Sequence, residues 1–233
     1  MGVFINVVAI IIGGLLGILF KRFINEDISK RILKYLGVVV IVLALSWAIS
    51  KTIIIKDGNL TTNGELLLIV SIVLGAIIGE IFKIDDRLNN LSSKLENKYK
   101  IKGFMSGFLA ATLLFGVGAM TVVGPIEEAL LGNNNILLVK SGLDFISSII
   151  LGSTLGYGVI FSSIPIFIVE ITFYLLAPYL SISTEMLNDI LLVGYVIIFT
   201  IGINLSGLGK IKTGNLLPSM LIPIIYHLIL NLL

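Results

Sequence analysis

The first apolar stretch of the chain, residues 2–20, reads GVFINVVAIIIGGLLGILF and is followed at once by Lys21 and Arg22. A helix needs about 20 apolar residues to cross the hydrocarbon of a bilayer. A cleavable signal peptide has basic residues before its apolar stretch and small residues at a cleavage site after it, whereas here the basic residues come afterwards. The stretch therefore predicts a transmembrane helix that is retained in the protein.

The composition extends this conclusion to the whole chain. Of the 233 residues, 57% are hydrophobic and only 13% are charged, and the mean hydropathy is +1.09. A soluble domain carries about 25% charged residues, so a soluble globular enzyme is excluded. The net charge of +2 and the scattered basic residues also argue against nucleic-acid binding. With no cysteine and one histidine, the chain has no thiolate or histidine-rich metal site, and we expect neither a cofactor nor enzymatic activity.

We therefore predict an all-α, polytopic transmembrane helical bundle that forms a single integral-membrane domain over residues 1–233. Apolar segments of suitable length indicate about eight spans. The predicted spans are Gly2–Phe20, Ile32–Ser50, Glu65–Phe82, Gly103–Val123, Ile136–Gly156, Val159–Leu180, Asp189–Ser206 and Asn215–Leu233.

The distribution of basic residues predicts the orientation of the bundle. Thirteen of the 16 lysines and arginines fall in alternate connections between the predicted spans. Connections rich in Lys and Arg stay in the cytoplasm, so both chain termini are predicted to lie outside. The connection near Tyr157 is short and uncharged, and spans five and six are therefore either a tight hairpin or one broken helix.

Two other connections carry their own patterns. Apolar residues recur at helical spacing over residues 84–100, with basic residues between them. This pattern fits either an amphipathic helix in the cytoplasmic headgroup layer or a solvated linker helix packed on the bundle. In the connection after the second span, Asp57-Gly58 is a hairpin-turn signal.

Two similar segments suggest an internal repeat. Residues 11–21 read IIGGLLGILFK and residues 73–83 read VLGAIIGEIFK, so that Gly13 and Gly17 correspond to Gly75 and Gly79. Many transporters are built from repeats, and here the halves would be 1–102 and 103–233, joined by the amphipathic helix. Alternatively, the glycines simply mark close helix contacts. The same glycine faces suggest a homodimer.

The fifth predicted span contains ionisable residues. Lys140 and Asp144 lie one turn apart and can pair, and Ser141 and Ser148 extend the same polar face. A charge in the middle of a membrane costs about 2.5–3.5 kcal/mol on insertion scales, so these residues need a reason to be there. They form either a substrate or ion path, or a neutralised pair that joins helices while Lys140 reaches the outer surface.

Glu170 lies in the middle of the sixth predicted span without a partner one turn away. It is either a coupling carboxylate for a proton or cation, or a neutral acid hydrogen-bonded to a neighbouring helix. Asn6, Asn204 and His227 are lone polar residues on apolar helices, and they are predicted to form interhelical hydrogen bonds rather than to bind a ligand.

The segment 116–132 shows signs of a discontinuous helix. Gly116 and Gly118 weaken a helix in mid-span, with Thr121 just beyond them, and Gly124-Pro125 is predicted to end it. Pro125–Leu131 is too short to span and reads as a broken or re-entrant element, which membrane proteins tolerate only beside a cavity. The alternative is an ordinary outward loop with a short surface helix.

Four motifs, spread over the chain, resemble the bacterial YqgA/YdfK family of uncharacterised membrane proteins. They read GAMTVVGPI over 118–126, LVKSGLD over 138–144, GSTLGYGV over 152–159 and KTGNLLP over 212–218. The likeness runs nearly end to end and implies a multi-pass protein of the bacterial plasma (inner) membrane with a role in transport. It implies no substrate, but it points to Lys140, Ser141, Asp144 and Asn215.

Together these observations predict a secondary transporter for a small ion or polar solute. The coupling carboxylate is predicted to be Asp144 or, as a second choice, Glu170. Alternatives are an ion or solute channel, and a non-transporting scaffold that uses helix 84–100 to bind a partner or membrane lipid. The predicted path residues are Gly116, Gly118, Thr121, Lys140, Ser141, Asp144 and Ser148.

Overall fold

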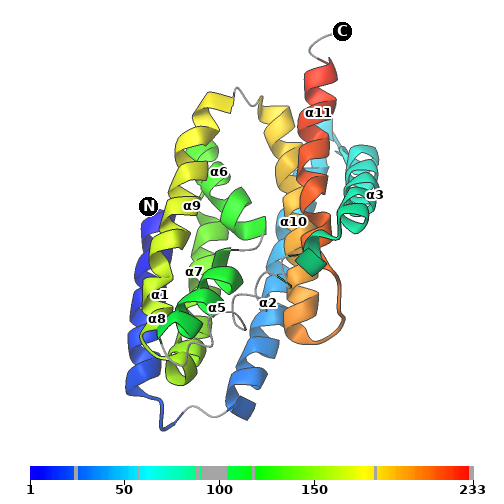
Figure 1. Ribbon diagram of the computed structural model, residues 1–233. Coiled ribbons are helices and arrows are strands. Elements are labelled where there is room, and N and C mark those ends of the chain that lie inside the picture. The colour runs from blue at the N-terminus through cyan, green and yellow to red at the C-terminus, as the bar shows by residue number, and fades with distance from the viewer. Residues whose placement is uncertain are drawn as a thin grey trace. The chain divides into compact units, whose positions relative to one another are not determined.

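The computed structural model describes residues 1–23, 26–56, 58–87, 90, 104–116, 119–180 and 183–230 (Figure 1). Apart from one pair of short strands, its regular elements are helices. The α-helices are α1 (Gly2–Leu19), α2 (Glu26–Thr52), α3 (Glu65–Phe82), α5 (Phe104–Gly116), α6 (Ala119–Leu131), α7 (Asn135–Leu155), α8 (Gly158–Phe161), α9 (Ser163–Leu176), α10 (Thr184–Ser206) and α11 (Leu221–Leu230), and the 3-10 helices are η1 (Ala177–Leu180) and η2 (Thr213–Met220).

The described residues contain seven helical segments long and apolar enough to cross a membrane. The predicted all-α polytopic bundle is therefore confirmed. Seven of the eight predicted spans correspond to these segments, which are 2–19, 34–52, 65–82, 135–155, 158–179, 184–206 and 213–230.

The fourth predicted span is not one continuous helix. The chain forms α5 and α6 there, each 13 residues long. Such a helix is about 20 Å long and falls short of the hydrocarbon thickness of about 30 Å. Helix α5 ends at Gly116, the first of the two glycines predicted to weaken this span, and α6 begins at Ala119; Gly118 lies outside the described residues.

The packing of α1 on α7 shows how this interrupted pair crosses. An added Cβ on Gly2 would meet Leu137, and one on Gly13 would meet Phe145, so residue numbers rise together and the two helices run parallel. An odd number of crossings must therefore separate them. The span segments of α2 and α3 supply two, and the charged segment 84–103 is unsuited to a third, so α5 and α6 together make one crossing.

The predicted break at Gly124-Pro125, and with it a separate re-entrant helix over Pro125–Leu131, is wrong. Helix α6 continues through Pro125 to Leu131. Proline has no N–H to donate to the carbonyl four residues earlier, but such a loss is tolerated in membrane helices where neighbouring groups compensate. Gly124 lets the helix pack closely at this point, because an added Cβ would come within 2.9 Å of Leu137.

The chain divides into two compact units that are interleaved in sequence. Unit 1 comprises residues 1–34 and 88–180, and unit 2 comprises residues 35–87 and 181–233. This division does not coincide with the predicted repeat halves 1–102 and 103–233, and the repeat itself stays a hypothesis. The segment predicted to join the halves lies largely outside the described residues, since 91–100 are not described.

Each unit packs one of the two glycine-bearing helices against another helix of the same unit. In unit 1, a Cβ on Gly17 of α1 would collide with the carbonyl oxygen of Ile149 on α7, and in unit 2 a Cβ on Gly79 of α3 would collide with that of Asn215 on η2. The predicted homodimer faces are therefore occupied within the chain. Figure 1 shows α1 beside α7 and α3 beside α11, which continues from η2.

Two connections follow the sequence patterns. Strands β1 (Ile53–Lys56) and β2 (Asn59–Thr62) pair antiparallel, as the turn signal predicted, and Gly58 adopts a positive φ of 78°. Between α7 and α8, Gly156 takes φ 75° and ψ −151°, a conformation open essentially to glycine. Of the two alternatives for spans five and six, the structure shows separate helices joined by a tight turn.

Candidate functional site

Three helices of unit 1 bring their ionisable and amide side chains to one place, which we call the ionic cluster: Asn6 on α1, Lys140 and Asp144 on α7, and Glu170 on α9. Lys140 pairs with Asp144, as predicted from their spacing. The Nζ atom of Lys140 also lies 3.5 Å from Oε1 of Glu170. Asn6 Nδ2 donates a hydrogen bond of 2.8 Å to the same Oε1 atom, so the amide and the ammonium group converge on one carboxylate oxygen.

The ionic cluster is buried. Lys140 is 3% exposed, Asp144 7% and Glu170 0%. Lys140 therefore does not extend to the outer surface, which was one of the two predicted arrangements. Without partners, the ammonium group of a buried lysine would be an uncompensated charge inside the protein. Here the carboxyl groups of Asp144 and Glu170 compensate the charge of Lys140.

The cluster holds one more acid than base. With Lys140 charged and both carboxylates ionised, the net charge is −1, and a buried net charge is costly. One added proton or monovalent cation makes the group neutral. The arrangement is therefore chemically suited to bind and release one positive charge.

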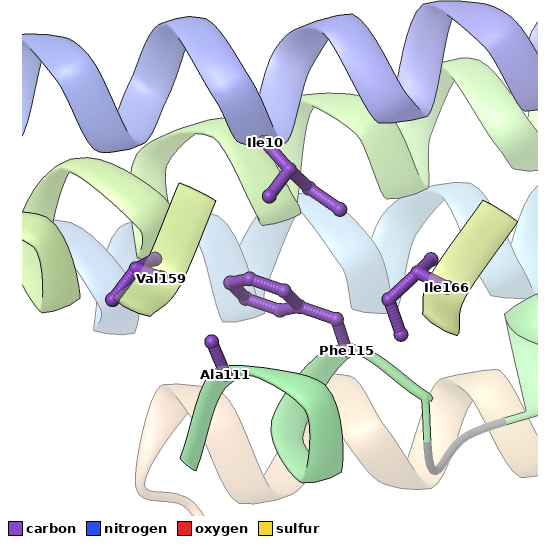
Figure 2. Packing of buried hydrophobic residues seen from close by; sticks show 5 residues of the cluster. All are labelled: Ile10, Ala111, Phe115, Val159 and Ile166. Carbon is purple, nitrogen blue, oxygen red and sulfur yellow. The ribbon is translucent and has the colours of Figure 1, made fainter. Parts of the chain in front are cut away.

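Five apolar residues form a layer on one side of the cluster, toward the end of α1 that Lys21 and Arg22 follow. Ile10 is one turn beyond Asn6 on α1, and Ile166 is one turn from Glu170 on α9. These two residues pack with Ala111 and Phe115 of α5 and with Val159 of α8, and Figure 2 shows the Phe115 ring pointing into the space between them. All five residues are at most 3% exposed, so this layer is apolar and buried.

On the opposite side of the cluster, α6 packs against α7 and α9. Its Glu128 accepts a hydrogen bond of 2.7 Å from the backbone N–H of Gly2, one turn before Asn6. The bond satisfies an N–H group at the start of α1 that has no partner within the helix. Phe115 and Glu128, which lie on two sides of the cluster, thus belong to α5 and α6, the two helices of the interrupted span.

The remaining predicted path residues take different places. Ser141 is buried and donates to the carbonyl of Leu137 within its own helix. Ser148, one turn beyond Asp144, is fully buried, and its hydroxyl has no hydrogen-bond partner in the described structure. Thr121 donates a hydrogen bond of 3.0 Å to the carbonyl of Phe115, which bridges the interruption between α6 and α5.

Gly116, the other described path residue, ends α5 and is half-buried. A Cβ placed there would approach Ile166 of the apolar layer at 3.2 Å. Gly116 and Thr121 therefore belong to the helix interruption, whereas Lys140, Asp144 and Glu170 belong to the ionic cluster.

In unit 2, ionisable groups pair near the ends of helices. His227 on α11 and Asp189 on α10 are joined by a 2.7 Å hydrogen bond, which agrees with the predicted interhelical role of the histidine. Lys212 lies 3.0 Å from Asp86 outside the spans, and this hydrogen bond and charge raise the pKa of the lysine. Asn204 on α10 bonds to the backbone of Ile211 and also donates a hydrogen bond of 3.1 Å to Thr213 at the start of η2, so it too joins two helices as predicted.

A shallow pocket of about 260 Å³ lies beside these unit 2 residues. The residues that line the pocket are Asp85, Asn204, Gly209, Lys210, Ile211 and Lys212.

Asn215, to which the resemblance points, accepts a hydrogen bond of 2.7 Å from the backbone N–H of Asp85. This bond connects η2 to the segment after α3.

Sequence reasoning underestimated two residues. Asn6 was predicted to form only an interhelical hydrogen bond; it does so, but its partner is the buried Glu170. Glu128 lies within the segment 116–132, and nothing in the local sequence predicts its hydrogen bond to Gly2. The signal available for Asn6 was its position in an otherwise apolar helix, yet its partner is 164 residues away and no local spacing reveals it.

Comparison with known proteins shows which family the chain belongs to. The chain is 34% identical over 224 residues to the "Uncharacterized membrane protein YdfK" of Bacillus subtilis (strain 168), covering 95% of this chain and 93% of that protein. It is 28% identical over 230 residues to the "Uncharacterized protein YqgA" of Escherichia coli (strain K12), with the same coverage. No solved structure matches. Residues 1–228 match the family described as "Protein of unknown function (DUF554)", and the chain belongs to this family.

Proposed function

We propose that this protein is a secondary transporter that moves a small polar solute or ion across the bacterial plasma membrane, and that the ionic cluster couples this movement to a proton or cation. One observation carries the proposal. A lysine and two carboxylates share a single buried site next to an interrupted membrane span.

The composition of the cluster supports binding more than a purely structural role. Helices in a membrane can be joined by neutral polar contacts, which avoid the cost of burying charge. A lysine with one carboxylate would already be neutral. The second carboxylate, Glu170, gives the cluster a place for one exchangeable positive charge, and that is what coupling requires.

The interrupted span supports a carrier in preference to a channel. Discontinuous helices commonly form the sites of transporters, because unwound backbone and a hinge lie at the same depth as the substrate. Here α5 and α6 lie on two sides of the cluster, with Phe115 packed in the apolar layer and Glu128 bonded to the start of α1. A carrier must pass through an occluded state, whereas a conducting channel needs a continuous path.

Uptake into proteoliposomes tests the proposal. Radiolabelled amino acids, carboxylic acids, sugars and inorganic ions are offered under an imposed gradient of protons or of sodium. We expect one class to accumulate above protein-free liposomes, and Lys140→Met and Asp144→Asn to abolish the accumulation. Lys212→Met is the matched control, because this lysine pairs with Asp86 outside the spans.

Two results would contradict the proposal. One is the absence of accumulation for every class by a folded, correctly inserted protein, which would favour the scaffold alternative. The other is wild-type uptake by the Asp144→Asn variant. Uptake that ignores both ion gradients would instead indicate a channel.

We further propose that both termini lie outside the cell, as the distribution of lysine and arginine predicts. The natural chain has no cysteine, so single cysteines can be introduced without a background. An impermeant maleimide added to intact cells is expected to label Asn59→Cys, in the exposed β2, but not Arg22→Cys after α1. Labelling of Arg22→Cys but not of Asn59→Cys would show that the termini lie in the cytoplasm.

A further inference from the structure

We propose that the exchangeable charge of the ionic cluster is a proton carried on Oε2 of Glu170, and that Asn6 is the positioning residue that makes this site select a proton over a metal cation. The link to transport rests on the proposed function above. The assignment of the proton itself rests on the contacts of Glu170.

The hydrogen bonds of Asn6 and Glu170 leave two acceptors unused. Asn6 Nδ2 donates to Oε1 of Glu170, and this fixes which end of the amide faces the carboxyl group. The other oxygens of the same pair, Asn6 Oδ1 and Glu170 Oε2, are buried and have no hydrogen-bond partner in the described structure. Buried acceptors without donors are costly, so this pair lacks a donor.

A protonated carboxyl group supplies that donor. An acid can donate through one oxygen and accept at the other, and a carboxamide can do the same. With a proton on Oε2, Glu170 gains a donor while Oε1 continues to accept from Nδ2, and the unused Oδ1 atom belongs to the same amide group. An ionised carboxylate has no donor to offer to this amide oxygen.

Electrostatics points the same way. Lys140 lies 3.5 Å from Oε1 of Glu170 and also pairs with Asp144. The pair of Lys140 and Asp144 is neutral, so a neutral Glu170 leaves the whole cluster neutral inside the membrane. A buried water molecule bound to the same oxygens would leave the charge of −1 in place.

A metal cation fits this position poorly. Hard divalent cations take about six oxygen ligands, whereas a proton needs one atom to hold it and one to accept from it. A metal ion at these oxygens would also stand close to the ammonium group of Lys140.

The other elements packed around α9 bring few further charges. In the described part of the chain, α1 and α5 contain no ionisable side chain, and the two glutamates of α6 have other contacts. Glu127 accepts a hydrogen bond from Asn133 and Glu128 accepts one from Gly2. The charged groups shown to face Glu170 are therefore Lys140 and Asp144 on α7.

Difference infrared spectroscopy of the purified full-length protein tests the proposal. At neutral pH we expect the C=O stretching band of a protonated, hydrogen-bonded carboxyl group. The band should disappear in Glu170→Gln and shift to higher frequency in Asn6→Leu, which removes both hydrogen-bonding atoms of the amide. Glu185→Gln, on the exposed start of α10, is the matched control and should leave the band unchanged.

A second measurement avoids dependence on one band. Glu170→Gln keeps a neutral side chain with a donor, so we expect its thermal unfolding midpoint to equal or exceed that of the wild type, whereas Glu170→Ala should lower the midpoint. Replacing sodium chloride with choline chloride should change neither value. Absence of the band, or a saturable stabilisation by sodium that Glu170→Gln removes, would overturn the proposal.

The outcomes separate this inference from the proposed function. A protonated Glu170 in a protein that transports nothing would leave the inference standing and remove the function. Sodium-driven uptake by a protein whose Glu170 is ionised would keep the function and overturn the inference.

Discussion

The two units solve the same packing problem with different polar residues. In unit 1, α1 buries Gly13 and Gly17 against α7, and in unit 2, α3 buries Gly75 and Gly79 against η2. Both pairs of glycines sit where a side chain would collide with the neighbouring backbone or side chains. Close approach of backbones through small residues is a common way to join membrane helices.

What lies beside the glycines differs. Unit 1 places Asn6, Lys140 and Asp144 along its glycine interface, whereas the unit 2 interface buries the neutral Ser71 and Ser219. Charged pairs of unit 2, such as Lys212 with Asp86, stand near helix ends, where water and headgroups are closer. The comparison indicates that glycine packing is common to both units, and that in the described residues the buried lysine and its carboxylate partners belong to unit 1.

The largest expected effect is the loss of the buried lysine. Lys140→Met leaves the carboxylate of Asp144 without its cation, and breaking a buried pair in this way costs about 3–5 kcal/mol of unfolding free energy. Unfolding in mixed micelles measures the loss. Lys51→Met is the control in unit 2, because Lys51 contacts the neutral Asn188 and should matter far less. Equal losses in the two variants would erase the contrast between the units.

Opening the apolar layer should expose the cluster. Ser148→Cys places a thiol at a fully buried position, so an impermeant maleimide should label it slowly. Adding Phe115→Ala removes a buried ring, and such a change costs about 3–5 kcal/mol in a protein core. A loss of about 1.4 kcal/mol in the closed state of the layer already raises the population of the open state about tenfold. We expect labelling to rise by about tenfold or more. An unchanged rate in a folded double variant would show that Phe115 does not close this side.

Glycine substitutions test the feature that the units share. Gly17→Val and Gly79→Val each force a side chain against a backbone carbonyl, and overpacking of this kind typically costs about 1–3 kcal/mol. Gly142→Ala is the control, since nothing lies within 4 Å of an added Cβ there. It should be neutral or stabilising, because alanine favours helix. If only one of the two valine variants loses stability, the packing of the two units is not equivalent.

The pair of His227 and Asp189 should contribute less than the ionic cluster. Its side chains are 11% and 20% exposed, so water partly replaces a lost partner. We expect Asp189→Asn, which keeps a hydrogen-bonding atom for the histidine, to cost about 1 kcal/mol in the same unfolding assay. A loss as large as that of Lys140→Met would give unit 2 an ionic site of its own.

The smallest effect is expected for the exposed pair of Lys212 and Asp86. The pKa of Lys212 is raised, so the lysine stays charged at neutral pH. The stabilisation from the pair is therefore present at pH 7 and is lost only as the pH rises through that raised pKa. Surface pairs contribute little. Lys212→Met should therefore leave the unfolding midpoint at pH 7 unchanged within error, and a clear drop would show that η2 depends on this contact.

The helices followed from hydropathy, because a run of apolar residues long enough to span is a local property of the sequence. Glycine and proline were harder to interpret. Gly116 does mark the end of a helix, whereas Gly124-Pro125 does not, and α6 continues through them where Gly124 packs closely on Leu137. Whether a helix tolerates proline depends on its neighbours, and these are not encoded in the local pattern.

By itself, the sequence determined that this is a multi-pass membrane protein, that Lys140 and Asp144 pair one turn apart, and that Glu170 needs a partner from elsewhere. These conclusions depend on composition and on spacing within one helix. Only the folded chain reveals that Asn6 and Lys140 are the partners of Glu170, and that α5 and α6 lie on two sides of them. Contacts between helices far apart in sequence are set by how whole helix faces pack, and no single segment carries that information.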